Sequence, residues 1–300
     1  MDKHYYHLCA NGAVTKSFII CLSDYFAAFN LIAVCAANTG VIVISFSIED
    51  THPHILIYGT LEACAKFKAM YETLYRHYVA ASRKTGERFI FQCELYPIDD
   101  PAYLRNVATY TVIQPTKDGK PIMHYDYVWG SGPLYFRNGH YTPPWYFDSN
   151  GIIQKPVTFG SLTVREKRKI LHTRLYSVPD EWMVCNGYIL PGNYIDITAF
   201  EGIYKTHNCY RVFLASPRKK EEEMLARMAE IRGIALEDSE ARRICGDSCK
   251  TMFGTRDPRR LDSRRRIALA QQLRKEYHMT FRQLATVVRL PESEIRIYVR

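Results

Sequence analysis

The sequence predicts an α+β protein in which a ferredoxin-like antiparallel sheet carries helices on one face and a mostly helical part follows. Over the first 95 residues, strand-like and helix-like patterns follow one another in the order β-α-β-β-α-β. Near the C-terminus, basic residues are concentrated around an apolar spacing typical of short packed helices. We therefore expect a sheet-based domain in residues 1–150, a mixed, mostly helical region of unknown role in 151–250, and a helix-turn-helix module in 251–300.

Each element of the first domain has a local sequence signal. Alternating or β-branched apolar runs predict strands at residues 5–10, 41–48, 54–58 and 88–95. Apolar residues at helical spacing predict a first helix that begins at the N-cap Ser23 and ends at Gly40. A second helix is expected to begin at the cap Thr60 and to run to about residue 81.

A third helix is expected to begin at Asp100 and Pro101, because an N-cap aspartate followed by proline is typical of a helix start, and to stop at Pro115. The segment 116–160 is rich in Gly, Pro, Tyr and Asn, which predicts an irregular wrap over the first domain. Beyond it, we expect helices at 162–175 and 219–231 and a short strand at 183–190.

Composition narrows the class of protein. The longest apolar run, residues 26–37, is interrupted by Asn30 and falls short of the roughly 20 residues that a membrane span needs. The first residues also lack the charged-then-apolar pattern of a secretory signal, so we expect a cytoplasmic protein without a membrane partner. The nine cysteines form no CxxC pair and are expected to be reduced and mostly buried.

A histidine pair marks the start of the third predicted strand. His52 and His54 flank Pro53, and alternate residues of a strand point to one face, so both imidazoles can reach one metal ion. Two histidines leave a divalent ion with open positions for a phosphate oxygen and a further protein ligand. The alternative is a surface turn. Since proline lacks a ladder donor, Pro53 predicts an edge strand or the first residue of a strand.

The third predicted helix offers a tyrosine and an amide on one face. Tyr110 and Gln114 are four residues apart, so their side chains are adjacent. A phenol beside a metal-bound phosphate is a chemically reasonable nucleophile. Considered alone, Tyr110 can equally be one of 22 tyrosines half-buried in a packing face.

The order of these motifs resembles single-tyrosine HUH transposases, including the REP-associated tyrosine transposases. That family has a His-hydrophobic-His strand in a ferredoxin-like fold, followed by a helix with Tyr-x-x-x-Asn/Gln. Its REP-associated branch continues into Asn-Pro-Val-Lys-x-Gly and a Tyr/Trp-x-x-Ser stretch. Here the matching runs are Tyr110-Thr-Val-Ile-Gln114-Pro115-Thr116-Lys117-Asp118-Gly119 and Tyr127-Val-Trp129-Gly-Ser131. The resemblance covers residues 5–136, and Gln114 matches the insertion-sequence branch.

The resemblance implies an HUH endonuclease fold and a metal-dependent DNA transposase. In that case Tyr110 is catalytic and forms a 5′-phosphotyrosine link, and His52, His54 and Gln114 hold Mg²⁺ or Mn²⁺. The implied partner is single-stranded DNA with hairpin or palindromic ends. A homodimer is left open, as is whether Tyr110 acts with its own histidines or with those of a second copy.

The C-terminal segment combines positive charge with a helix-turn-helix pattern. From Arg256 to Arg300, 12 Arg and Lys stand against 5 Asp and Glu, so the segment carries 12 − 5 = +7 of the chain's +9. Thr280 and Gln283 form a predicted capping box, and Pro291 is expected to start the recognition helix. The predicted packing positions are Leu284, Ala285, Val288, Leu290, Ile295 and Tyr298.

The expected DNA-contacting side chains are Lys117, Arg264, Arg265, Arg266, Arg282, Ser293, Arg296 and Arg300. A helical bundle with a solvated basic face, or a dimerisation module, is the alternative for this segment. For the whole chain, two rivals remain beside the transposase. One is a transposase-derived DNA-binding regulator without strand-transfer activity, and the other is a replication or relaxase-type nickase.

Overall fold

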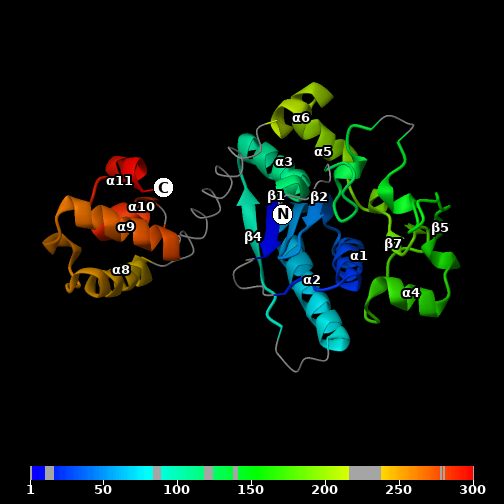
Figure 1. Cartoon of the computed structure of the whole chain (residues 1–300), viewed down its shortest axis with the longest axis horizontal. Helices are drawn as coiled ribbons and strands as arrows, with labels where there is room; N and C mark the ends of the chain where they lie inside the picture. The colour runs from blue at the N-terminus through cyan, green and yellow to red at the C-terminus, as the bar shows by residue number, and fades with distance from the viewer. Residues whose placement is uncertain are drawn as a thin grey trace. The chain divides into compact units, whose positions relative to one another are not determined.

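The computed structural model describes residues 2–10, 17–83, 89–117, 124–137, 141–215, 238–277, 279 and 281–299. The chain divides into two compact units, Met1–Lys220 and Glu221–Arg300. Figure 1 labels their helices and strands. No helix in the described part of the chain has the length and apolarity required to cross a membrane.

A four-stranded antiparallel sheet forms the centre of the first unit. Its strands are β1 (His4–Ala10), β2 (Ile42–Ile48), β3 (Pro53–Gly59) and β4 (Cys93–Ile98), in the spatial order β2-β3-β1-β4. The predicted β-α-β-β-α-β order is therefore confirmed. The predicted start of the fourth strand at residue 88 is wrong, because Phe89 and Phe91 pack against Tyr75 and ladder pairing begins only at Cys93.

Helices α1 (Leu22–Thr39) and α2 (Leu61–Ser82) cover one face of this sheet, as expected. Gly40 ends α1 in the left-handed conformation, with φ 68°, and Thr60 caps α2 by accepting from the backbone N–H of Ala63. The predicted N-cap Ser23 is wrong. Cys21 is the N-cap of α1, because the Asp24 carboxylate accepts from the backbone N–H of Cys21 and starts the helix earlier.

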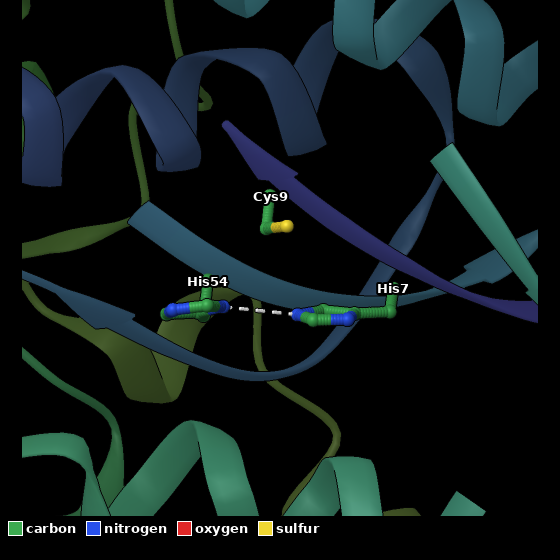
Figure 2. Close-up of side chains that lie close together, drawn as sticks. All are labelled: His7, Cys9 and His54. Atoms are coloured by element: carbon green, nitrogen blue, oxygen red, sulfur yellow. Dashed lines mark hydrogen bonds between the residues drawn. The ribbon is translucent and has the colours of Figure 1, made fainter. Parts of the chain in front are cut away.

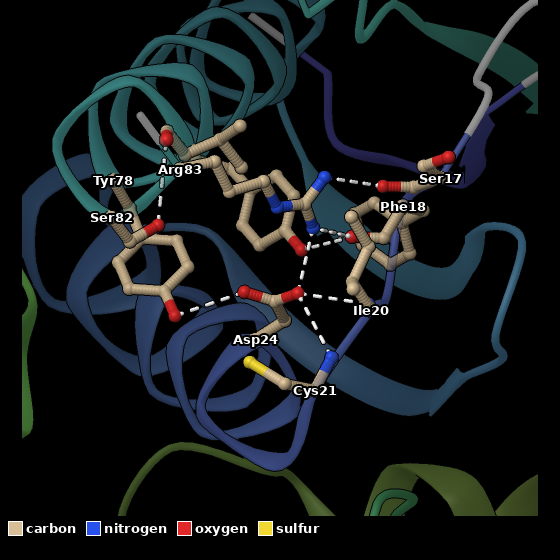
Figure 3. Close-up of polar contacts among 10 residues, drawn as sticks. Ser17, Phe18, Ile20, Cys21, Asp24, Tyr78, Ser82 and Arg83 are labelled. Carbon is tan, nitrogen blue, oxygen red and sulfur yellow. Dashed lines mark hydrogen bonds and ion pairs between the residues drawn. The ribbon is translucent and has the colours of Figure 1, made fainter. Parts of the chain in front are cut away.

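Asp24 also joins the first turn of α1 to the end of α2. Figure 3 shows its carboxylate between Arg83 and Tyr78, with Arg83 Nη2 at 2.7 Å and the Tyr78 hydroxyl at 3.0 Å. Burial opposes the ionisation of Asp24, but hydrogen bonds from the backbone N–H of Ile20, from Arg83 and from Tyr78 outweigh it. They hold the pKa of this carboxyl below its ordinary value of 3.8.

We expect Asp24→Asn to lower the free energy of unfolding by about 3 kcal/mol, since one partner of a buried pair is lost. The matched control Asp180→Asn removes a carboxylate that is 74% exposed beside Lys167 and should cost less than about 1 kcal/mol. Because the folded pKa of Asp24 is depressed, its stabilisation is present above the unfolded pKa and is lost as the pH falls through the folded value. Urea unfolding of wild type and both variants at pH 7 and below pH 3.8 measures the free energies of unfolding. If the difference in free energy between wild type and Asp24→Asn does not shrink at low pH, the prediction is contradicted.

Helix α3 (Pro101–Lys117) lies on the opposite face of the sheet from α1 and α2. Asp100 caps it, as predicted, by accepting from the backbone N–H of Tyr103 at 2.6 Å. The expectation that Pro115 stops the helix is wrong, because the helix continues through Lys117; a proline near the end of a helix removes only one ladder donor. Helices α5 (Ile197–Tyr204) and α6 (His207–Leu214) pack on α3, and residues 107–114 are buried.

The residues after α3 brace the free edge of β2. Tyr127 and Tyr135 donate their hydroxyls to the carbonyls of Ile48 and Ile44, both at 2.6 Å, and Ser131 bonds the backbone of Phe46. The predicted irregular wrap is thus confirmed in the described residues 124–137 and 141–160. Its short elements are η1 (Gly132–Leu134), η2 (Pro144–Tyr146), β5 (Val157–Thr158) and η3 (Phe159–Ser161).

The rest of the first unit contains α4 (Val164–Leu171), β6 (Met183–Cys185), β7 (Tyr188–Ile189) and η4 (Pro191–Asn193). The helix predicted at 162–175 is too long, because His172 takes the left-handed conformation and ends it. The strand predicted at 183–190 is a hairpin, since Asn186 and Gly187 both have positive φ. The helix predicted at 219–231 lies outside the described residues.

Asn30, the asparagine that interrupts the apolar run of α1, connects residues 170–189 to the sheet domain by hydrogen bonds. Asn30 is buried in α1, donates to the carbonyls of Ile170 and Gly187, and accepts from the backbone N–H of Ile189. A buried amide whose donors and acceptor are satisfied stabilises rather than destabilises its surroundings. Residues 170–189 are therefore part of the first unit.

The second unit is helical, as expected. It contains α8 (Asp238–Phe253), η5 (Pro258–Arg260), α9 (Ser263–Tyr277), α10 (Phe281–Val288) and α11 (Glu292–Tyr298). Leu284, Val288, Leu290 and Ile295 are buried in one apolar core, and Ala285 packs against it. The prediction for Tyr298 is wrong: it is 54% exposed, and Val299 fills that place because α11 ends between them. Thr280, half of the predicted capping box, lies outside the described residues.

Candidate active site

The turn between β2 and β3 presents the histidine pair. The backbone N–H of Glu49 donates to the carbonyl of His52, which closes the turn, and Pro53 is the first residue of β3. The sequence predicts that Pro53 lies either in an edge strand or at the first residue of a strand. Because β3 is an inner strand, the second of these predictions is the one confirmed. His52 itself lies in the turn rather than in the strand. Its Nδ1 is 2.7 Å from the hydroxyl of Thr51, which orients the ring.

His54 lies at the centre of the predicted constellation. Its ring is 4.5 Å from that of His52, centroid to centroid, and 4.9 Å from the ring of Tyr110, which meets it edge-on. Its Nε2 is 3.3 Å from the side-chain amide of Gln114. The structure therefore brings His52, His54, Tyr110 and Gln114 together, although α3 lies some sixty positions after the histidines in the chain.

Hydroxyl contacts hold α3 over this part of the sheet. Thr111 is 2.6 Å from Ser45 of β2, oxygen to oxygen, and on the other side Thr109 is 2.8 Å from the hydroxyl of Tyr204 in α5. Both contacts are buried, where a satisfied hydrogen bond fixes one packing arrangement. Tyr110 and Gln114, one turn apart, are thereby directed at β3.

Two residues of β1 lie beside His54 but outside the constellation that it forms with His52, Tyr110 and Gln114. Cys9 lies directly opposite His54 in the β1–β3 ladder, and His7 follows on the same face. Figure 2 shows the imidazoles of His7 and His54 edge to edge, with Nε2 of His7 3.1 Å from Nδ1 of His54, and Cys9 beside them. Burial, followed by the nearby His52, lowers the pKa of His7 to about 3, so His7 is neutral at physiological pH.

This group can hold a metal ion. One ligand atom from each of His7, Cys9 and His54 lies within 4.8 Å of the others, and all three residues are buried. Sequence analysis did not find His7 and Cys9. The signal was available, because the predicted first strand places a histidine and a cysteine two residues apart, and such residues share a face.

The predicted DNA-contacting residues divide into three groups. Arg264, Arg265 and Ser293 are exposed on α9 and α11. Arg266 donates to the backbone carbonyls of Leu261, Arg289 and Arg259, so its guanidinium holds the motif together. The side chains of Lys117, Arg282, Arg296 and Arg300 lie outside the described part of the structure.

Arg289 makes the turn between α10 and α11. It stands where a turn glycine is usual, and it adopts the left-handed conformation itself, with φ 61°. The hydrogen bond from Arg266 to its carbonyl holds this strained residue in place. The two predicted helices and their connecting turn are thereby confirmed.

Comparisons of the chain with protein-family models, with curated proteins and with solved structures found no match. The functional interpretation therefore depends on the geometry of the site and on the motif spacing.

Proposed function

We propose that this chain is a metal-dependent HUH single-strand DNA endonuclease and strand transferase, a transposase in which Tyr110 is the nucleophile. One observation carries the proposal: Tyr110 and Gln114 of α3 both contact His54 of β3. The predicted nucleophile and the predicted amide ligand thus lie beside the same predicted metal-binding histidine. The resemblance in motif order supports the same assignment.

The residues around His54 fit a hard divalent ion. Mg²⁺ and Mn²⁺ favour oxygen ligands, which Gln114 and a bound phosphate would supply beside the imidazoles of His52 and His54. Nε2 of His54 lies 3.3 Å from the Gln114 amide, a spacing suited to two ligands of one ion. Rotation of that amide presents its oxygen in place of its nitrogen. His52, His54 and Gln114 would hold the ion, which when bound polarises the scissile phosphodiester.

Tyr110 would carry out the cleavage step itself. The phenolic oxygen of Tyr110 forms the new bond to phosphorus and gives up its proton to solvent, and the bond from phosphorus to the 3′ oxygen breaks as that oxygen takes up one proton in return. The leaving oxygen therefore departs as a 3′-hydroxyl. The 5′-phosphotyrosine link conserves the phosphodiester bond, so a later 3′-hydroxyl can attack it and rejoin the strands without an energy source.

Cleavage of a hairpin-flanked single strand tests this function. Wild-type protein should cut it with Mg²⁺ or Mn²⁺, should stop when EDTA removes the ion, and should resume when Mn²⁺ is restored. Binding of the hairpin without any cut under all metal conditions would favour the DNA-binding regulator instead. Cutting that persists in EDTA would contradict the metal assignment.

The helix-turn-helix is proposed to supply DNA affinity separately from chemistry. Exchanging Arg264 and Arg265 together for alanine should weaken hairpin binding and lower the slope of log affinity against log salt by up to about 2, since each phosphate contact contributes about one unit. The exposed Arg165 of α4 provides a matched control, and Arg165→Ala should leave the slope unchanged. Fluorescence anisotropy measures the affinities. If the slope of log affinity against log salt is the same for the double variant and wild type, these arginines do not contact the DNA.

A further inference from the structure

We infer that His7, Cys9 and His54 form a binding site for a soft divalent metal ion such as Zn²⁺, and that a metal bound there takes His54 away from the catalytic constellation. The binding site stands on its own geometry. Its inhibitory consequence rests on the proposed function.

The two nitrogen atoms already have nearly the separation that a tetrahedral ion requires. Nε2 of His7 and Nδ1 of His54 are 3.1 Å apart, against about 3.3 Å for two imidazole ligands of one zinc ion. One ligand atom from each of the three residues, the sulfur of Cys9 included, lies within 4.8 Å of the others, and a sulfur and a nitrogen bound to one zinc ion are about 3.6 Å apart. Cys9 lies directly opposite His54 in the ladder, and metal binding would require its sulfur to move toward the two nitrogens.

The chemistry of the donors selects the metal. A thiolate with two imidazoles favours Zn²⁺ and other soft or borderline ions, whereas Mg²⁺ favours oxygen ligands over a thiolate. His7 is fully buried, and its Nδ1 has no hydrogen-bond partner among the described residues. Binding is balanced by loss of the thiol proton, because Cys9 ligates as a thiolate and both histidines ligate as neutral rings.

The two nitrogens of His54 face two different groups. Nδ1 faces His7 and Nε2 faces Gln114. An imidazole that binds a metal through Nδ1 keeps its proton on Nε2, and metal-bound histidines usually donate that proton to a carbonyl or carboxylate. Gln114 offers such an acceptor through its amide oxygen. Nε2 then becomes a donor and cannot serve as a ligand for the catalytic ion, so the two metal sites exclude each other.

Cobalt spectroscopy on the full-length reduced protein tests the site without reference to activity. Co²⁺ should bind with a thiolate-to-cobalt charge-transfer band in the near ultraviolet, and Zn²⁺ should displace it. Cys9→Ala and His7→Gln should lose the band. Cys35→Ala, which removes a buried thiol of α1, and Cys249→Ala, which removes a buried thiol of the second unit, should retain it. Circular dichroism verifies that each variant is folded.

Absence of the band in wild type, or its persistence in folded Cys9→Ala, overturns the proposal. The inhibitory consequence is measured with Mn²⁺-dependent cleavage. Zn²⁺ should inhibit wild type, and Cys9→Ala should cut normally but require at least about 10-fold more Zn²⁺ for half-inhibition. Equal inhibition of both overturns the exclusion of one site by the other. If no cleavage occurs at all, the proposed function fails, while the cobalt band still decides the metal site.

Discussion

Tyr110→Phe is expected to lower the rate of single-strand cleavage by at least about 10³-fold, because it removes the attacking oxygen and nothing else. The ring of Tyr110 lies edge-on against His54, and phenylalanine preserves that packing. Folding, metal binding and hairpin binding should therefore be unchanged. Gel-based cleavage assays with Mn²⁺, beside anisotropy measurements of binding, separate the two effects.

Tyr103 provides the matched control for this substitution. It lies on the same helix about two turns earlier and is also buried, so Tyr103→Phe should cut at the wild-type rate. Cleavage by Tyr110→Phe at the wild-type rate would mean that water or another tyrosine attacks. The single-tyrosine mechanism would then have to be abandoned.

His54→Ala is expected to have the second largest effect, a loss of about 10²-fold or more in cleavage with hairpin binding nearly intact. His54 contacts His52, Tyr110 and Gln114 at once, so its removal disturbs every part of the constellation. His52→Ala should behave similarly. Gln114→Ala should be milder, because water can occupy one coordination position.

The exposed His77 of α2 serves as the control for histidine removal, and His77→Ala should leave cleavage unchanged. The measurement compares cleavage rates and hairpin affinities over a series of Mn²⁺ concentrations. If folded His54→Ala loses affinity and cleavage in equal proportion, the imidazole supports DNA binding and not chemistry.

The element order of the first unit could be predicted because its signals are local. β-branched runs, the cap at Thr60 and the left-handed Gly40 act within a few residues of themselves. The errors arose where tertiary contacts override local preference. Asp24 starts α1 earlier than Ser23 because its carboxylate is held by Arg83 and Tyr78 from a distant helix. The continuation of α3 to Lys117 has a different cause, since a proline near the end of a helix removes only one ladder donor.

The site could be predicted only in part. Spacing alone placed Tyr110 beside Gln114 and His52 beside His54, and the resemblance paired the two segments. The contribution of β1 was missed because pairing between β1 and β3 joins residues 47 positions apart in the chain, and no local pattern specifies that register. The spacing of His7 and Cys9 predicts that they share a face of β1, but their position beside His54 followed only from the alignment of the strands.

The helix-turn-helix shows the same division between local pattern and tertiary packing. The apolar spacing predicted the buried positions well, but it gave the last one to Tyr298 in place of Val299. The charge pattern predicts Arg266 as a phosphate contact, and the structure shows that its guanidinium also donates to three backbone carbonyls. A count of positive charges cannot distinguish a structural arginine from an exposed one.

Trapping the covalent intermediate tests the role of Tyr110 most directly. Wild-type protein incubated with Mn²⁺ and a 3′-labelled, hairpin-flanked single strand should carry the label on a denaturing gel, because a 5′-phosphotyrosine retains the DNA downstream of the cut. Peptide mass spectrometry should place the adduct on Tyr110, and a 5′ label should leave as a free fragment ending in a 3′-hydroxyl. Retention of the 5′ label, or an adduct on a different residue, would contradict the account.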